Sequence, residues 1–291
     1  MGPRVQYLTL LLLCLAGTAF LEFRFDARVW RRPLSVARAL VVPWVLFNVV
    51  NEVSVFRGLW WYNPNYITGW RVPRRYPIEE MAFFVVVPLC ALLTFEAASA
   101  VYDGRVVAPW ARPSPTGRPA RPAPPRPDRA PNPRIRTTVV AGAALLITGL
   151  ALLAAMVQEA RTDPIVRSEV RHEYALLSDR FDYNLPEYPI IVMLLLALVL
   201  VVELGWWRTG ILRMRAYWST MAICLCFMVP VNGWLTKLSA PVVIYAQDEF
   251  SGLRPIWDIP FEDVGFAISL LTLVLMSWVR VIRRTGPVAE P

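Results

Sequence analysis

Two pairs of adjacent acidic residues are the side chains of this sequence best suited to chemistry. They are Glu79-Glu80 and Glu262-Asp263, and each pair follows a proline and one apolar residue at the start of an apolar segment. Neighbouring carboxylates repel, and burial disfavours ionisation of both, so such a pair tends to hold one proton. A protonated carboxyl beside an ionised one suits acid–base catalysis. Capping of two helix N-termini is the simpler alternative, but one acid would suffice for that.

The two acid pairs belong to an internal repeat. In both copies an asparagine stands 29 residues after a glutamate, and a glycine stands eight residues before the proline. The glutamate-to-proline spacing is 55 residues in one copy and 57 in the other. Four features in register indicate a duplication, and their polar character favours a substrate pocket shared by the halves over a duplication without a common site. The repeated positions are Glu22 and Glu203, Asn51 and Asn232, Gly69 and Gly252, and Pro77 and Pro260.

Aromatic residues precede both acid pairs. Their ring faces would stabilise a cation, although a belt of aromatic residues at the membrane interface also explains many of them. Asn51 and Asn232 are expected as buried amides that either join helices or bind site residues. The residues predicted to contact a substrate are Trp61, Tyr62, Tyr66, Asn51, Asn232, Trp234 and Tyr245.

Glu22 and Glu203 have two interpretations. Both are expected at the cytoplasmic ends of their helices. There they would either contribute to the site or pair with nearby arginines, Arg24 and Arg208, and the sequence favours neither interpretation over the other.

Seven apolar segments are long enough to hold these residues in a membrane, where each helix needs about 20 apolar residues. The first also resembles a signal peptide, but we expect a retained helix because the residues after it recur in the second copy. The sequence therefore predicts an all-α integral membrane protein with about seven transmembrane helices, in which a bridging helix joins two parallel three-helix repeats. The segments are 5–21, 36–54, 79–99, 137–157, 188–206, 217–235 and 262–280.

The composition supports a membrane protein. Apolar residues make up 56% of the chain, and 18% are charged where about 25% is usual in soluble domains. The net charge is +8, but Lys237 is the only lysine, so the arginine excess indicates a GC-rich genome and no nucleic-acid partner. One histidine and four cysteines without a C-x-x-C spacing predict no metal site. Dinucleotide and P-loop motifs are missing from the sequence, so we expect no cofactor.

The arginines predict the orientation. Of the 30 basic residues, 19 fall in segments that share one side of the membrane with the C-terminus. By the positive-inside rule, the N-terminus lies outside the cell and the C-terminus in the cytoplasm.

The predicted organisation has five parts. A Pro/Arg-rich cytoplasmic segment separates the repeats, and we favour a plain fusion linker over a docking arm for anionic lipid or a partner. The parts are the first repeat at 1–103, the linker at 104–136, the bridging helix and external loop at 137–187, the second repeat at 188–284 and a tail at 285–291.

Residues around both acid pairs resemble a known family, the membrane lycopene cyclases of actinobacterial and archaeal type. The first half of that family is similar to WYNPNYITG (61–69), PIEE (77–80) and Phe83-Phe84, and the second half to NGWLTKLSAPVVIY (232–245) and IPFED (259–263). Many of these bacteria have the halves as separate chains, whereas here they are fused. The sequence departs from the family pattern at Asn51 and Asn232, because many members have aspartate at these positions. The departure matters for the chemistry, since an amide does not exchange protons at neutral pH.

The resemblance implies a carotenoid cyclase. A proton adds to the terminal double bond of lycopene or a related linear carotenoid, a neighbouring double bond closes the ring, and proton loss sets a β- or ε-ring. It implies Glu79, Glu80, Glu262 and Asp263 as proton donors and acceptors, with no cofactor and with membrane lipid as surroundings. The alternatives are a small transporter or lipid-binding protein, or a non-catalytic scaffold for other carotenoid enzymes.

Overall fold

The computed structural model describes residues 3–71, 76–104 and 186–285. The predicted bridging helix at 137–157 and His172 lie outside the described residues, as do almost all of the predicted linker and tail.

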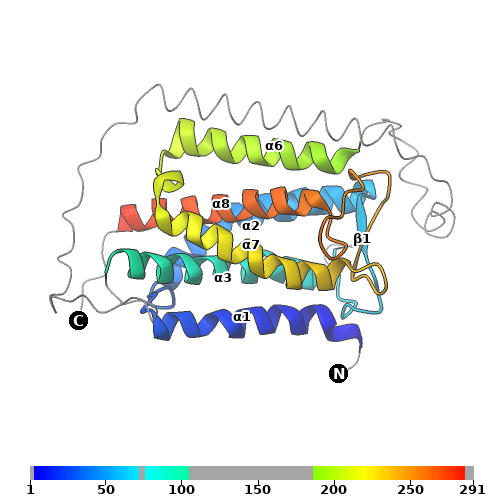
Figure 1. Cartoon of the computed structure of the whole chain (residues 1–291), viewed down its shortest axis with the longest axis horizontal. Coiled ribbons are helices and arrows are strands. Elements are labelled where there is room, and N and C mark those ends of the chain that lie inside the picture. Colours follow the sequence, from blue (N-terminus) through cyan, green and yellow to red (C-terminus); the bar gives the residue numbers. More distant parts are fainter. Residues whose placement is uncertain (1–2, 72–75, 105–185, 286–291) are drawn as a thin grey trace.

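Six long helices lie side by side along one axis (Figure 1). All six are long and apolar enough to cross a membrane, which confirms the all-α membrane class. Each extends a few residues beyond its predicted apolar segment, because polar residues near a membrane surface continue the helix. The helices are α1 (Gln6–Arg24), α2 (Pro33–Arg57), α3 (Ile78–Tyr102), α6 (Glu187–Val201, continued by the π-helix η2, Val202–Trp207), α7 (Arg215–Thr236) and α8 (Phe261–Thr285).

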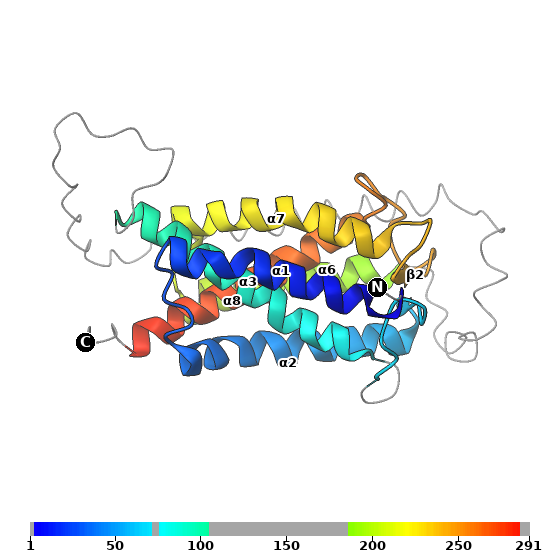
Figure 2. The same cartoon turned by 90° about the horizontal axis from the view of Figure 1, so that it is seen from below.

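The helices form two interlocked, parallel repeats, α1–α3 and α6–α8. The first helix of each repeat packs on the third helix of the same repeat, α1 on α3 and α6 on α8. The second helix crosses over, so that α2 packs on α8 and α7 packs on α3 (Figure 2). This arrangement confirms the predicted parallel repeats and places α3 and α8 at the centre.

A short pair of strands joins the repeats at one end of the bundle, here called the strand end. β1 (Trp60–Tyr62) pairs antiparallel with β2 (Val243–Tyr245), and Trp61 lies opposite Ile244. Both of these residues stand 18 positions before the first acid of their repeat. Equivalent residues therefore pair with each other, and the local twofold axis passes between them.

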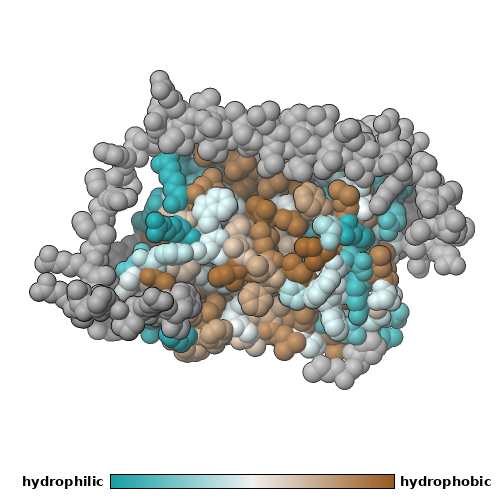
Figure 3. Space-filling model, viewed as in Figure 1, coloured by the Kyte–Doolittle hydropathy of each residue, from teal (hydrophilic) through white to brown (hydrophobic). Residues whose placement is uncertain are grey.

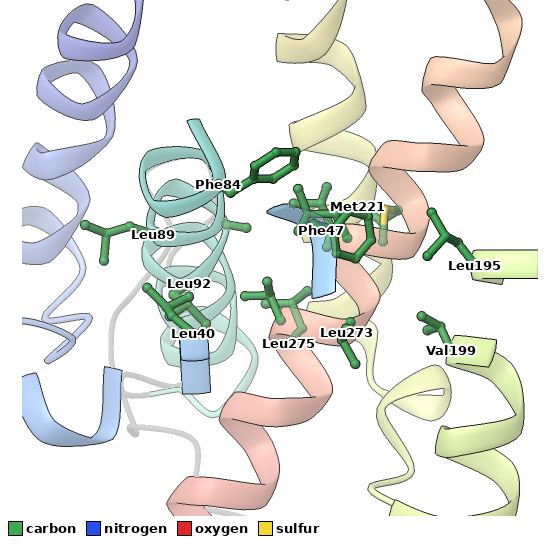
Figure 4. Packing of buried hydrophobic residues seen from close by; sticks show 14 of the residues in the cluster. Leu40, Phe47, Phe84, Leu89, Leu92, Leu195, Val199, Met221, Leu273 and Leu275 are labelled. Carbon is green, nitrogen blue, oxygen red and sulfur yellow. The ribbon is translucent and has the colours of Figure 1, made fainter. Parts of the chain in front are cut away.

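On the face shown in Figure 3, apolar side chains cover the middle of the bundle, and polar ones gather near its two ends. Outward-facing residues such as Leu13, Leu194 and Phe227 are more than 60% exposed, as expected where lipid replaces water. The interior holds residues from all six helices, among them Phe84, Leu92 and Leu275 (Figure 4). The acids are thus held by a rigid apolar bundle that closes at the strand end.

Candidate active site

The first acid of each pair binds the loop that precedes it. Glu79 and Glu262 are 1% and 5% exposed. Oε1 of Glu79 accepts a hydrogen bond from the backbone N–H of Thr68 at 2.6 Å, and Oε1 of Glu262 accepts one from Ser251 at 2.7 Å. In both residues Oε2 is buried and has no hydrogen-bond partner among the described residues. Each repeat therefore has one buried carboxyl with a free oxygen.

The repeated glycines explain this loop geometry. Gly69 and Gly252 directly follow the two residues whose N–H groups bind the acids. Their φ angles are +89° and +73°. Such positive values are strained for a residue with a Cβ atom but not for glycine. The glycine-to-proline spacing found in the sequence therefore positions the loop over the carboxyl.

The second acid of each pair is held by tyrosine hydroxyls. Tyr7 of α1 donates to Oε2 of Glu80, and Tyr188 of α6 donates to Oδ1 of Asp263 at 2.5 Å. Asp263 also accepts hydrogen bonds from Tyr245 at 3.0 Å. Hydroxyl donors stabilise the ionised form of a carboxyl, so these bonds fix the position of the second acids and offset part of the cost of burying their charge.

The two repeated asparagines act differently. Asn232 donates directly to Oδ2 of Asp263 at 2.6 Å. Asn51 donates instead to the hydroxyl of Tyr62 at 3.0 Å, and that hydroxyl faces the Glu80 carboxyl. The amide thus reaches the acid directly in the second repeat and through a tyrosine in the first.

The strand tyrosines remain protonated. Burial, together with the negative charge of Glu80, raises the pKa of Tyr62 well above its ordinary value. Removal from water and the charge of Asp263 do the same to the pKa of Tyr245. Both hydroxyls therefore act as hydrogen-bond donors at neutral pH.

The two acid pairs meet in one aromatic cluster. The ring of Trp60 lies 5.0 Å from that of Tyr188 and 5.8 Å from that of Tyr245. Glu80 and Asp263 are close enough to interact electrostatically. Within the described residues, no group of three or more histidine, cysteine or acidic side chains is arranged to bind a metal. The arrangement is suited to moving protons between buried groups.

Three of the predicted substrate contacts have other surroundings. Trp234 is 47% exposed, and the Lys237 ammonium lies 4.4 Å from its ring, so it faces away from the acids. Trp61 is half-buried on the strand pair, and the backbone oxygen of Tyr66 accepts a hydrogen bond from the N–H of Tyr7. Tyr62, Asn51, Asn232 and Tyr245, in contrast, lie at the acid pairs.

Glu22 and Glu203 are not paired with Arg24 and Arg208 in the described part of the chain. Glu22 accepts a backbone hydrogen bond from Val29 at 2.9 Å. Glu203 binds the loop after α6 in the same way, with four hydrogen bonds from Thr209, Gly210 and Ile211. Since backbone N–H groups are fixed while surface arginines lose side-chain entropy on pairing, these carboxylates hold turns far from the acid pairs.

Tyr7 and Tyr188 were not among the site residues predicted from the sequence. A signal for them was present, because each stands 15 residues before the repeated glutamate of its half, Glu22 or Glu203. A tyrosine in the first turn of an apolar helix is usually explained as a residue at the membrane interface. The equal spacing of the two tyrosines was therefore not recognised as part of the repeat.

Comparison with known proteins gives one family for both repeats. The chain is 35% identical over 89 residues to a bifunctional lycopene cyclase/phytoene synthase of Phaffia rhodozyma, a match that spans 31% of this chain and 12% of the relative. No solved structure matches significantly. The family model for lycopene cyclase matches residues 6–98 and 187–279, once over each repeat and over more than half of the chain. The chain therefore belongs to the lycopene cyclase family.

Proposed function

We propose that this membrane protein cyclises the end groups of lycopene, or of a related linear carotenoid, by proton transfer from and to its acid pairs. One observation carries the proposal: each repeat sets a buried carboxyl with a free oxygen beside a carboxyl held by tyrosine hydroxyls. The family membership supports the substrate class.

The reaction needs one proton in and one proton out. A carboxyl proton adds to the terminal double bond of the linear end group and leaves a tertiary cation. The neighbouring double bond attacks this cation, which closes a six-membered ring and moves the positive charge into the ring. A carboxylate then removes a ring proton, and the choice of proton sets a β- or an ε-ring. No electrons are gained or lost overall, so the reaction is an isomerisation.

We assign proton donation to Glu79 and Glu262. Among the described residues their Oε2 atoms are buried and have no hydrogen-bond partner, so these oxygens are open to a substrate. Glu80 and Asp263 are assigned proton acceptance, because the tyrosine hydroxyls position them and stabilise their ionised form. The proposal keeps all four acids as catalytic residues.

Aromatic rings would stabilise the cation. Trp60, Tyr188 and Tyr245 lie beside the second acids, and Phe266 lies one helical turn below, 6.4 Å from the Tyr188 ring. A cation over such faces gains about 2 kcal/mol or more when water is excluded. The same rings would keep water from adding to the cation.

The proposed orientation follows from the arginines. The strand end, with the N-terminus and the acid pairs, would face outside, and the opposite end the cytoplasm (Figure 1). A hydrocarbon substrate would then enter from the lipid and place its end group beneath the strands.

Expression in a lycopene-accumulating bacterium tests the proposal. Cyclisation should turn the red pigment yellow-orange, and chromatography identifies the ring type. In deuterated water each new ring should carry one deuterium from the exchanged carboxyl. Unchanged lycopene, with the protein shown to be present in the membrane, would refute the function.

A further inference from the structure

A small basic cavity lies at the end of the bundle opposite to the strands. Its volume is about 180 Å³. We call it the arginine pocket, and its lining residues are Trp207, Thr209, Arg280, Arg283 and Arg284. It shares no residue with the acid pairs or with the aromatic cluster around them.

The positive charge of the arginine pocket is not neutralised by an ion pair within the described chain. The ion pairs found there involve other arginines. Glu203, the acid nearest in sequence, already binds Thr209 and two further N–H groups. Glu96 and Asp103 line a separate, neighbouring cavity, whose wall includes Arg283. The pocket therefore concentrates positive charge that an anion would neutralise.

One of the guanidinium groups is held in place. The Arg280 guanidinium lies 5.1 Å from the centroid of the Trp207 ring. Stacking on an aromatic face leaves the N–H groups at the guanidinium edge free for hydrogen bonds, a geometry that suits the oxygens of phosphate.

The first repeat shows that the fold does not need these arginines. The positions on α3 that correspond to Arg280, Arg283 and Arg284 of α8 lie 183 residues earlier, the offset between Glu79 and Glu262. They are occupied by the apolar residues Ala97, Ala100 and Val101. The arginines are therefore an addition of the second repeat and not a requirement for ending the central helix.

The depth of the pocket matches the phosphate layer of a bilayer. Arg280 lies 17 residues after Asp263 on the same helix, and Arg284 lies 21 residues after it. At 1.5 Å per residue these distances are about 26 and 32 Å, close to the thickness of the hydrocarbon core.

We propose that the arginine pocket binds the phosphate of an anionic phospholipid headgroup. The ligand chemistry is a phosphate ester with a net negative charge at the membrane surface, and the lipid supplies it at high local concentration. This inference does not depend on the proposed function of the acid pairs.

Lipid retention by the purified full-length protein tests the proposal. Native mass spectrometry in neutral detergent would compare added phosphatidylglycerol with phosphatidylcholine, and a third arm would add inorganic phosphate alone. The test variant is Arg283→Gln/Arg284→Gln. The matched control is Arg31→Gln/Arg38→Gln, which removes the same charge from exposed arginines at the same end of the bundle.

The wild-type protein and the control should retain phosphatidylglycerol in preference to phosphatidylcholine. Loss of one interfacial arginine weakens binding of an anionic lipid about fivefold. The test variant loses two arginines, so it should bind phosphatidylglycerol about 30-fold more weakly. Equal weakening in the control would show diffuse attraction, and equal binding of both lipids would show no headgroup site; either result overturns the proposal. Equal binding of inorganic phosphate would make free phosphate the ligand and overturn the lipid assignment.

A second variant guards against misfolding of the first. Arg280→Lys keeps the charge but loses the planar stack on Trp207, and it should also weaken retention of phosphatidylglycerol. If size-exclusion chromatography shows that the double variant is misfolded, Arg280→Lys decides the test. Unchanged retention of phosphatidylglycerol in Arg280→Lys would then overturn the proposal.

Discussion

The Tyr188 hydroxyl lies 2.5 Å from Oδ1 of Asp263, and Tyr7 makes the equivalent hydrogen bond to Glu80 in the other repeat. Both tyrosines come from the first helix of their repeat and reach the third. A hydrogen bond to a charged group is worth about 1.5–3 kcal/mol. These bonds therefore fix the position of the second acids and stabilise their ionised form.

Removal of either hydroxyl should slow cyclisation. Tyr7→Phe and Tyr188→Phe keep the ring and lose the donor, so we expect about 10- to 100-fold lower product formation from the lost hydrogen bond. Pigment chromatography normalised to membrane protein measures the effect. The control is Tyr102→Phe, which loses a hydroxyl bonded to Ser219 at the other end of the bundle. Full activity in both test variants would contradict the role given to the tyrosines.

Glu79→Gln and Glu262→Gln should each remove most cyclisation. Glutamine still accepts the loop hydrogen bond through its amide oxygen but has no proton to donate, so folding should survive while chemistry fails. Deuterium uptake into the ring should fall with the product. Asp248→Asn removes an exposed acid at the same end and should leave activity unchanged. Two fully active glutamine variants would show that these acids only anchor their loops.

Asn232→Asp should shift the pH dependence of cyclisation. The amide donates to Asp263 at 2.6 Å, and a carboxylate there would face a carboxylate, an arrangement that tolerates only one charge. We expect activity to be lost at neutral pH and regained as the pH falls. The matched variant Asn51→Asp contacts a tyrosine hydroxyl instead of an acid and should be affected less. Equal pH profiles for both variants would exclude this explanation.

Glu249 should make the protein less stable at high pH. Burial raises its pKa to about 7 from an unfolded value of 4.5, with the charges of Glu187 and Asp248 acting in the same direction. Between these pH values the folded state holds more protons than the unfolded state, so stability falls as the pH rises. Glu249→Gln should remove that fall, seen as a smaller difference in melting temperature between pH 5 and pH 8. An identical difference in wild type and variant would contradict the expectation.

Gly265→Ala should destabilise the contact between α6 and α8. A Cβ at this position would lie 2.5 Å from Cγ1 of Val192, closer than packing allows. Overpacking of this kind costs about 1–3 kcal/mol. Gly17→Ala on α1 adds the same methyl group where nothing lies within 4 Å, so it should leave the melting temperature unchanged or raise it. Similar thermal stability for both variants would show that α6 moves aside freely.

Much of this architecture could be predicted from the sequence. Apolar length alone located the six described spans to within about one turn, because bilayer thickness fixes helix length. The spacing of Gly69 and Gly252 from the acids also indicated the repeat, since a shared loop conformation preserves the distance along the chain. The fused halves and the family followed from the residues around the acid pairs. The orientation and the catalytic roles stay predictions.

Other features could not be read in this way. Pairing of Trp61 with Ile244 joins residues far apart in the chain, and a three-residue strand has too little periodicity to be recognised. Trp234 was placed at the site because it lies in the motif, but its helix face turns it outward. For Glu22 and Glu203 the sequence suggested arginine partners, because a sequence shows which side chains are charged. It does not show which backbone N–H groups the fold brings close to a carboxylate, and these are the partners that the structure has.

The crossing of α2 onto α8 and of α7 onto α3 has a consequence for how such a molecule could arise. The middle helix of each set packs mainly on the third helix of the other set, so each set needs the other for a complete interior. Two identical copies of a three-helix ancestor could meet this need as a symmetric homodimer, with the short strands meeting on the dimer axis. Fusion of the two genes would then have freed each copy to diverge, as glutamate and aspartate have at positions 80 and 263.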